Sequence, residues 1–458
     1  MINPIKGGVG LVKYVIIGGD AAGMSAATQI RRLQPDAEII VFEMGEILSY
    51  AQCGLPYYVA GLVPTAEDLI ARTKEKFEEK YKITIYLKHE VTLIDPVSNH
   101  VTAFSIESQE EVVANYDYLL IATGGEAIVP PWNGTDLDGV TVLKTIADAN
   151  RILKWLDERK EIQKVAIIGG GYIGLEMAEA FHIRGKKVQI IDIADQLNAS
   201  FDSDIAEHAK VELEKKGVKV SLGEEVKGFK GEDRVQTVMT DKGEYAADLV
   251  VISIGIRPNS EMAKNAGIEL GPRNAIRVNS NMQTNIENIY AAGDCATHFH
   301  IVKQQDDYIP LGTTANKQGR IAGTNLGGGN AEFKGIVGTA VMKVIDLEMA
   351  RTGLNEKEAK ALNIDYETVT VKSRHHATYY PNAERLFIKL VFKKDDRTLL
   401  GGQVVGYAGV DKRIDVLAMA ITFRMTVDEL QDLDLAYAPP FNGVWDPVQQ
   451  ASRVAEKK

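Results

Sequence analysis

Two glycine-rich segments of the same design, 151 residues apart, constrain what this chain can fold into more than any other feature. The first, Gly18–Gly23, follows the apolar run Lys13–Ile17, and the second, Gly169–Gly174, follows Lys164–Ile168. A helical pattern comes directly after each glycine segment. A strand, a glycine turn and a helix in this order are typical of a Rossmann unit, whose backbone N–H groups approach a pyrophosphate. The sequence therefore predicts an α/β chain with two Rossmann-like dinucleotide-binding domains.

An acidic residue ends the second strand of each unit. Glu43 lies 20 residues after the last glycine of its turn, and Asp192 lies 18 residues after the last glycine of the other. A carboxylate at this position binds the ribose hydroxyls of a dinucleotide. Asp192 would repel a 2′-phosphate, and no Arg or Lys follows it over 193–196, so we expect NADH to be preferred and NADPH to remain possible. The first turn departs from the pattern, because Asp20 stands where the middle glycine is usual.

Three later segments end buried-strand patterns in turns. Tyr118–Gly125 and Leu249–Gly255 each follow one nucleotide unit, as a chain crossing between two domains would. The third, Ile289–Ala296, reads IYAAGDCA. Its Asp294 would suit the ribityl hydroxyls of a flavin, and it could also cap a helix, which we expect to start directly after it. These segments predict that the second nucleotide unit is inserted into the first domain.

In this order, the motifs resemble the flavin disulfide reductase family. The resemblance implies FAD on the first unit, NAD(P)H on the second, and a C-terminal α+β dimerisation domain. It assigns an FAD-binding domain to 1–120 and 252–330, an NAD(P)H-binding domain to 121–251 and the dimerisation domain to 331–458. The implied FAD-binding residues are Gly18, Ala22, Gly23, Glu43, Ala122, Thr123, Gly124 and Asp294. The implied NAD-binding residues are Gly169, Gly171, Tyr172, Ile173, Gly174, Glu176, Asp192 and Gly255. Tyr172 is expected over the flavin and Glu176 at the nicotinamide amide, and no metal site is expected.

The chain has only 2 cysteines, which argues against a disulfide framework and indicates a reducing compartment. Cys53 stands in the segment SYAQCGLPYY, and Cys295 follows 242 residues later, so this segment holds no cysteine pair. We expect Cys53 at a helix start, where the helix dipole lowers the pKa of a thiol, and interpret it as the redox-active residue. Cys295 is interpreted as an inert thiol.

The lone cysteine resembles the branch of the family that includes NADH peroxidases, NADH oxidases and coenzyme A-disulfide reductases. The segment is similar to the last of these, which implies that Ser49 and Gln52 lie beside the substrate, although Gln52 replaces the Asn of that motif. Peroxidase-like members carry a His where this chain has Ala21, so that alternative lacks its acid–base helper. The motifs around Tyr379 and Tyr437 also resemble coenzyme A-disulfide reductases, in which two tyrosines of the partner subunit reach the cysteine. We expect both to act in catalysis.

Coenzyme A is an anion, whereas this chain carries a net charge of −11, which also argues against a broad nucleic-acid surface. A local basic pocket is therefore required. By resemblance, Ser25, Gln29 and Arg32 line the pantetheine and adenine path. Further candidate cations are Arg31, Arg72, Lys74, Lys317 and Arg320.

The leading prediction is a homodimeric FAD enzyme that uses NAD(P)H to reduce coenzyme A disulfide, or a related coenzyme A persulfide or polysulfide, through Cys53. Two alternatives stay open: a water-forming NADH oxidase acting through a sulfenic acid on Cys53, and an electron-transfer flavoprotein serving a protein partner. Residues 1–12 lack the apolar stretch of a secretory signal, and no apolar run reaches the length of a membrane span. We therefore expect a cytoplasmic protein with no membrane or nucleic-acid partner.

Overall fold

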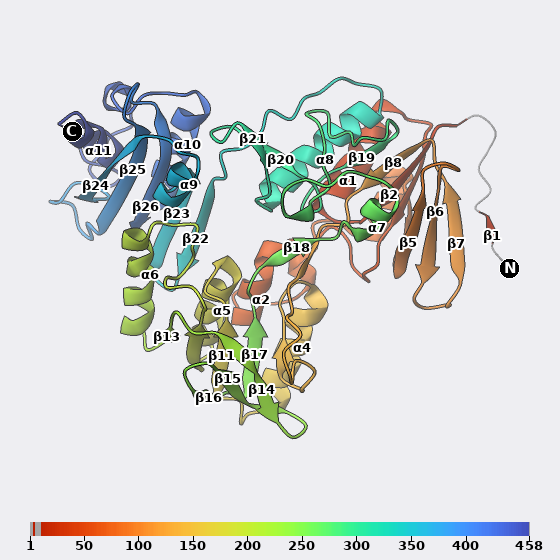
Figure 1. The fold of residues 1–458 in the computed structure, drawn as a ribbon, viewed down its shortest axis with the longest axis horizontal. Coiled ribbons are helices and arrows are strands. Elements are labelled where there is room, and N and C mark those ends of the chain that lie inside the picture. The colour runs from red at the N-terminus through yellow and green to blue at the C-terminus, as the bar shows by residue number, and fades with distance from the viewer. Residues whose placement is uncertain (1–2, 5–10, 458) are drawn as a thin grey trace.

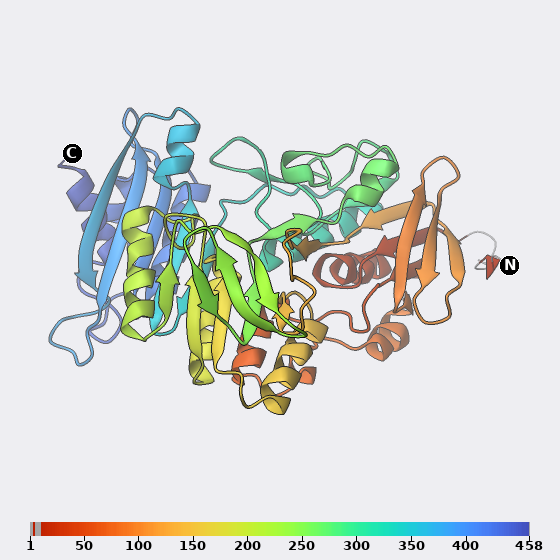
Figure 2. The same ribbon diagram turned by 60° about the horizontal axis from the view of Figure 1, so that its bottom comes forward.

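The computed structural model describes residues 3–4 and 11–457, which form two α/β nucleotide-binding domains and a C-terminal α+β domain (Figure 1). The first domain and the C-terminal domain lie at opposite ends of the molecule, and the second domain lies between them in both views (Figure 2). This arrangement confirms the predicted fold class. The domain boundaries given above stay a prediction. Among the described residues, no helix is both long and apolar enough to cross a membrane.

A five-stranded parallel sheet with the order β19-β8-β2-β3-β4 forms the centre of the first domain. Helices α1 (Ala21–Leu33) and α8 (Gly312–Leu326) lie side by side here (Figure 1). Two glycines of α8 allow this close approach, because a Cβ on Gly319 or Gly323 would lie 2.3 or 2.6 Å from a carbonyl oxygen of α1. The strands are β2 (Lys13–Ile17), β3 (Glu38–Phe42), β4 (Thr84–Tyr86), β8 (Tyr118–Ile121) and β19 (Ile289–Ala291).

The second domain repeats this plan with the parallel order β10-β17-β11-β12-β13. Its strands are β10 (Val140–Thr141), β11 (Lys164–Ile168), β12 (Lys187–Ile191), β13 (Lys219–Ser221) and β17 (Leu249–Ile252). Its helices are α4 (Ile146–Glu158), α5 (Tyr172–Ile183) and α6 (Ser203–Lys215). The chain enters and leaves this domain through the antiparallel pair β9 (Gly125–Ala127) and β18 (Ile256–Pro258), as the two glycine-ended runs predicted.

Small antiparallel sheets and short helices complete the two domains. In the first domain, β5, β6 and β7 form a meander, and the two-residue strand β1 pairs in parallel with β7. These strands are β1 (Asn3–Pro4), β5 (His89–Asp95), β6 (His100–Ser105) and β7 (Glu111–Asn115). The matching strands of the second domain are β14 (Val226–Gly231), β15 (Val235–Thr240) and β16 (Glu244–Ala246). The short helices are α2 (Leu55–Ala60), α3 (Lys74–Tyr81) and α7 (Glu261–Asn265).

The C-terminal domain is a five-stranded antiparallel sheet in the order β22-β23-β26-β25-β24. Helices α10 and α11 pack against it, and their apolar side chains join those of β25 and β26 in one buried cluster. The strands are β22 (Ala340–Val344), β23 (Leu347–Gly353), β24 (Tyr366–Arg374), β25 (Arg385–Lys393) and β26 (Leu399–Gly406). The helices are α9 (Glu356–Ala361), α10 (Val410–Thr422) and α11 (Pro447–Ala455).

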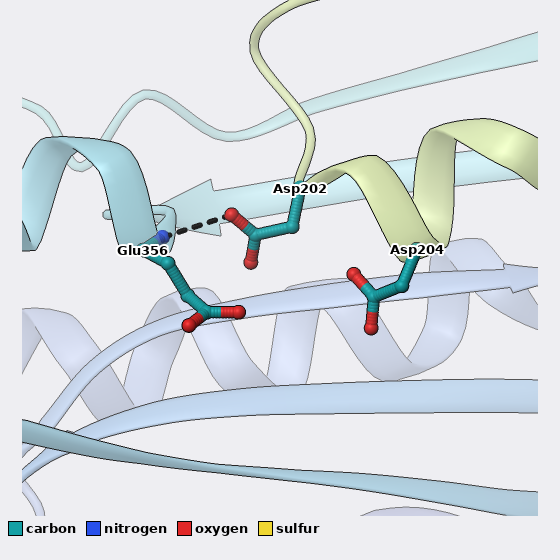
Figure 3. Close-up of side chains that lie close together, drawn as sticks. All are labelled: Asp202, Asp204 and Glu356. Atoms are coloured by element: carbon teal, nitrogen blue, oxygen red, sulfur yellow. Dashed lines mark hydrogen bonds between the residues drawn. The ribbon is translucent and has the colours of Figure 1, made fainter. Parts of the chain in front are cut away.

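Three carboxylates meet where the second domain contacts the C-terminal domain (Figure 3). Asp202 and Asp204 lie at the start of α6, and Glu356 begins α9. The Nζ of Lys389, from β25, lies 3.1, 2.7 and 2.5 Å from their respective oxygens. The single lysine ammonium therefore bridges all three carboxylates and offsets part of their negative charge, and the four side chains act as an ionic clamp between the two domains.

One predicted element is wrong. No helix follows Asp294 directly. The chain instead forms the hairpin of β20 (His298–His300) and β21 (Gln305–Asp307) before α8 begins at Gly312. The Asp294 side chain is consequently free of a capping role and remains available to a ligand.

Candidate active site

The two glycine turns have the same geometry and require glycine for the same reasons. Gly18 and Gly169 have φ values of +104° and +102°, which L side chains rarely adopt. The last glycine of each turn also packs against the first glycine of the same turn. A Cβ on Gly23 would lie 1.9 Å from the Gly18 carbonyl oxygen, and a Cβ on Gly174 would lie 2.0 Å from the Gly169 carbonyl oxygen. Each turn therefore brings strand and helix together with no room for a side chain.

Each helix that follows a glycine turn begins with unshielded N–H groups. Neither α1 nor α5 has a side-chain cap at its N-terminus, and neither has an acidic residue in its first turn. Unpaired N–H groups at a helix start, together with the positive end of the helix dipole, form a site for a phosphate. The two turns therefore fit the pyrophosphates of two dinucleotides.

The acidic residues predicted at the ribose hold these turns in shape. The Gly19 N–H donates to Oε2 of Glu43 at 2.7 Å, and the Gly170 N–H donates to Oδ2 of Asp192 at 2.6 Å. The second oxygen of each carboxylate accepts from a backbone N–H two residues further on, at 2.7 Å for Glu43 and 2.9 Å for Asp192. Ribose binding by Glu43 and Asp192 stays a prediction, and the structure adds a role in orienting each turn.

The other predicted cofactor residues lie in the connections between the two domains. Thr123 is tied to Asn259, with hydrogen bonds of 2.6 and 2.9 Å between them. Gly124 and Gly255 have φ values of +65° and +125°, so both chain crossings bend at a residue in the left-handed region. The half-buried Asp294 lies beyond β19, and burial raises the pKa of its carboxyl.

Cys53 lies in a short 3-10 turn, Gln52–Gly54, directly before α2, and its side chain is exposed. The expectation that its pKa is lowered is wrong. Protein packed around the sulfur removes part of its contact with water and raises the pKa of the thiol, and the carboxylates of Glu176 and Asp294 add to this, while Lys144 opposes it. Helix α2 has only 6 residues, so its dipole is small. The positive charge that favours the thiolate comes from the side chain of Lys144.

Lys144 is the functional candidate that sequence reasoning missed. Its Nζ donates to Oε1 of Gln52 at 2.9 Å and lies 4.0 Å from Oδ2 of Asp294. The Gln52 amide in turn donates to Asp20 at 2.7 Å. Lys144 is 91 residues from Cys53 and stands in no motif, so the sequence carries no signal for it.

Asp20, which replaces the middle glycine of the first turn, completes this network. Its Oδ1 accepts the Tyr50 N–H at 3.2 Å, and burial raises its pKa to about 6. The departure from the glycine pattern therefore has a structural reason, because Asp20 orients the residue that precedes Cys53. The polar network runs from Asp20 through Gln52 and Lys144 to Asp294.

Helix α5 presents a second carboxyl to the cysteine segment. Burial raises the pKa of Glu176 to about 7, and the Tyr57 hydroxyl lies 3.5 Å from its Oε1. Glu176 also acts on the pKa of Cys53, so the two side chains lie in the same region. A group that titrates near neutral pH beside a thiol is a candidate for proton transfer.

Tyr172 begins α5, and its hydroxyl lies 3.3 Å from Oγ of Ser200. Burial raises its pKa, and the charges that act on it are those of Arg351 and Glu358 in the C-terminal domain. This side chain therefore faces the C-terminal domain, and its place over a flavin stays a prediction. The neighbouring Ile173 is exposed.

The predicted coenzyme A residues lie along one face of α1, beside α8. The Ser25 hydroxyl donates to the Asn316 carbonyl at 3.2 Å, Gln29 donates to Thr324 at 3.1 Å, and Arg32 is exposed. Lys317 and Arg320 are exposed on the neighbouring helix. This face joins polar and cationic side chains from two helices.

Three other predicted cations already make contacts within the protein. The Arg31 guanidinium donates to carbonyl oxygens of Tyr81, Lys82 and Pro35, and Arg72 stacks over two aromatic rings of α3. Lys74 pairs with Glu78 at 2.7 Å.

Ser49 contributes main-chain hydrogen bonds to Gly19 and Ala71, and its φ of +51° marks a strained turn before the cysteine.

Tyr379 and Tyr437 lie together in the C-terminal domain, with 3.3 Å between their hydroxyl oxygens. Their exposed fractions are 74% and 47%, which is unusual for tyrosines. Within one chain, this domain lies at the opposite end from the first nucleotide-binding domain (Figure 1). The cavity beside both tyrosines is lined by residues of the C-terminal domain, and a role for them at Cys53 of the partner subunit stays a prediction.

Cys295 is buried, and its sulfur donates to the carbonyl oxygens of Ile121 and Ala292 at 3.4 Å each. Burial raises its pKa. It is a packed, protonated thiol, in line with its interpretation as inert.

Two dinucleotide cradles, with a lone exposed thiol beside the polar network of the first, define a two-nucleotide redox flavoprotein. Residues 12–319 match the family model described as pyridine nucleotide-disulphide oxidoreductase, and residues 339–447 match the dimerisation domain of that family. The chain belongs to the pyridine nucleotide-disulphide oxidoreductase family, whose members are FAD-dependent NAD(P)H oxidoreductases.

Three relatives match nearly the whole chain. An NAD(P)H sulfur oxidoreductase (CoA-dependent) of Pyrococcus abyssi is 41% identical over 96% of this chain and 97% of that protein. An NADH oxidase of Methanocaldococcus jannaschii is 37% identical over 98% of this chain and 99% of that protein. A coenzyme A disulfide reductase of Staphylococcus haemolyticus is 33% identical over 94% of this chain and 96% of that protein. The solved structure of reduced Bacillus anthracis CoADR-RHD is 37% identical, with a TM-score of 0.95 over 98% of this chain and 80% of that one.

Proposed function

We propose that this protein is a homodimeric, NADH-dependent reductase of coenzyme A disulfide or of a related coenzyme A persulfide or polysulfide. One observation carries the proposal: Cys53 is an exposed thiol with a lysine and a carboxyl beside it, and the second cysteine of the chain is buried elsewhere. A thiol with no cysteine partner exchanges with a sulfur that the substrate brings. The relatives named for coenzyme A and for sulfur reduction support this substrate class.

The first step follows from the surroundings of Cys53. The thiolate attacks one sulfur of the disulfide, so that a bond from Cys53 to that sulfur forms, the substrate's own sulfur–sulfur bond breaks, and one coenzyme A leaves as a thiolate. Lys144 favours the attacking thiolate by its positive charge. A tyrosine hydroxyl of the partner subunit, from Tyr379 or Tyr437, gives the leaving thiolate its proton.

The second step reduces the mixed disulfide that remains on Cys53. A bound FAD would supply this sulfur pair with two electrons taken from NADH. Two electrons and one proton release the second coenzyme A as a thiol and restore the Cys53 thiolate. Glu176, with its pKa of about 7, is the proton donor available from α5.

The choice of nicotinamide cofactor follows from Asp192. Both of its oxygens accept from backbone N–H groups, which fixes the orientation of the carboxylate beside the second turn. A fixed negative charge at the ribose disfavours the 2′-phosphate of NADPH, so NADH should give the higher kcat/KM.

The decisive experiment is mass spectrometry of the intact holoenzyme after incubation with coenzyme A disulfide. We expect an adduct of coenzyme A mass that dithiothreitol removes and that the Cys53→Ser variant does not form. Anaerobic NADH consumption should rise with coenzyme A disulfide and stop in the same variant. A wild-type protein that forms no adduct and consumes no NADH with this substrate contradicts the proposal.

The NADH oxidase relative favours one second candidate, reduction of oxygen to water through a sulfenic acid on Cys53. Fast NADH turnover with oxygen alone, indifferent to any disulfide, would favour that activity. Because the first glycine turn has no His, the charged groups that act on the sulfur and could serve this chemistry include Lys144, Glu176 and Asp294.

A further inference from the structure

The C-terminal domain contains a cavity of about 600 Å³ that the steps described above do not use. Tyr379 and Tyr437 form part of its wall, and Lys372, Arg374 and Arg385 contribute three cationic side chains. Its volume lies within the range of small-molecule sites. We call these three residues the cationic wall.

The cationic wall is built into the strand register. Arg374 of β24 and Arg385 of β25 are direct cross-strand partners in the sheet. Lys372 lies two residues before Arg374 on the same strand, so all three side chains leave the same face of the sheet. Like charges directly opposite one another destabilise a strand pair. Because this arrangement costs stability, its presence indicates that the concentrated positive charge has a binding role.

No carboxylate within the described part of the chain forms an ion pair with the cationic wall. Arg374 donates to the Ala383 carbonyl oxygen, and the Lys372 ammonium lies 5.7 Å from the centre of the Phe387 ring. Both contacts leave the positive charge unneutralised. In a chain with a net charge of −11, three unpaired cations around one cavity indicate an anionic ligand.

We infer that this cavity binds the phosphate-bearing end of the second coenzyme A in a coenzyme A disulfide substrate. The inference rests on the proposed function. A disulfide of two coenzyme A molecules carries two such ends, and the α1 face, with Ser25, Gln29 and Arg32, accounts for one. The leaving half departs from beside Tyr379 and Tyr437, and the cavity begins at these same side chains. Guanidinium groups match phosphate oxygens in geometry as well as charge.

The assignment predicts that the cationic wall matters only for substrates with two coenzyme A halves. The test compares coenzyme A disulfide with the mixed disulfide of coenzyme A and 2-mercaptoethanol, whose leaving half is small and neutral. The variant is R374Q/R385Q, and the matched control is K394Q/R453Q, which removes two cations that do not line the cavity from the same domain.

In R374Q/R385Q, we expect the KM for coenzyme A disulfide to rise about tenfold or more, because two charge-assisted contacts are lost. The KM for the mixed disulfide should stay within about twofold of wild type, because its small, neutral leaving half makes no charged contact with the cationic wall. The Tm should not fall, because the variant relieves a like-charge pair. K394Q/R453Q should keep both KM values.

Two results would overturn the inference while leaving the proposed function intact: an unchanged KM for coenzyme A disulfide in R374Q/R385Q, or an equal rise for both substrates. A wild-type enzyme that turns over neither disulfide contradicts the proposed function itself, so the two failures are distinguishable.

Discussion

At the scale of single residues, the environment of Cys53 balances opposing charges. Loss of water and two carboxylates raise the pKa of the thiol, and Lys144 lowers it. Because Lys144 is held by the Gln52 side chain at 2.9 Å, its position depends on a residue adjacent to the cysteine itself. The cation that favours the thiolate is therefore a lysine brought in from the second domain's entry segment.

Replacing Lys144 with Gln should make Cys53 less acidic. Removal of the one cation that favours the thiolate raises the pH of half-maximal alkylation by iodoacetamide. The control is Lys154→Gln, which removes an exposed lysine of α4 that pairs with Glu158. Cys295 is buried and should not interfere. An unchanged alkylation profile in Lys144→Gln would remove Lys144 from the site.

At the scale of elements, each glycine turn has two separate roles: it lets the strand and the helix pack closely, and it leaves space for a ligand. Gly174 has to be glycine because a Cβ would lie 2.0 Å from the Gly169 carbonyl oxygen, whereas no heavy atom lies within 4 Å of a Cβ on Gly171. Gly171 also has an ordinary φ of −79°. One glycine is therefore required by the fold, and the other leaves space that the protein itself does not use.

Alanine substitutions should separate these two roles. Gly174→Ala should cost about 1–3 kcal/mol of stability, since backbone must move to admit the methyl group. Gly171→Ala should leave the Tm unchanged but raise the KM for NADH, because its methyl group stands where the dinucleotide approaches. Thermal unfolding and anaerobic rapid-mixing kinetics of flavin reduction measure the two effects. An unaltered KM in Gly171→Ala argues against a dinucleotide at this turn.

The elements that local patterns specify could be predicted from the sequence, and those that depend on distant contacts could not. Both strand–glycine–helix units and the crossing segments follow from apolar spacing and glycine position. The helix expected after Asp294 is replaced by a hairpin, since turn patterns do not distinguish the two. Lys144 approaches Cys53 only through tertiary structure. The direction of the Cys53 pKa shift could not be predicted, because partial burial of the thiol and carboxylates from α5 and from the segment after β19 all arise from tertiary structure.

At the scale of the whole molecule, the ionic clamp fixes the second domain against the C-terminal domain. Lys389 is 4% exposed in its side chain and Asp202 is 7% exposed. Lys389→Met should cost about 3 kcal/mol in urea unfolding, because a buried carboxylate loses its counter-charge. Lys393→Met, at the solvent end of the same strand, removes a pair with Asp396 and should cost less than about 1 kcal/mol. Partial rescue of Lys389→Met by Asp202→Asn would identify the uncompensated charge as the cause, and equal costs for both lysines would contradict the clamp.

The position of the tyrosine pair makes the dimer itself a functional prediction. If Cys53 of one subunit works with Tyr437 of the other, a mixed dimer of Cys53→Ser and Tyr437→Phe subunits contains one intact site and one doubly altered site. Such dimers, isolated through two different tags, should recover about half of the wild-type activity with coenzyme A disulfide. The Tyr437→Phe parent should reduce the disulfide slowly while NADH still reduces its flavin at a near-normal rate, and the Cys53→Ser parent should be inactive. If both residues acted within one chain, no site of the mixed dimer would be intact, and its activity would not exceed the mean of the two parents.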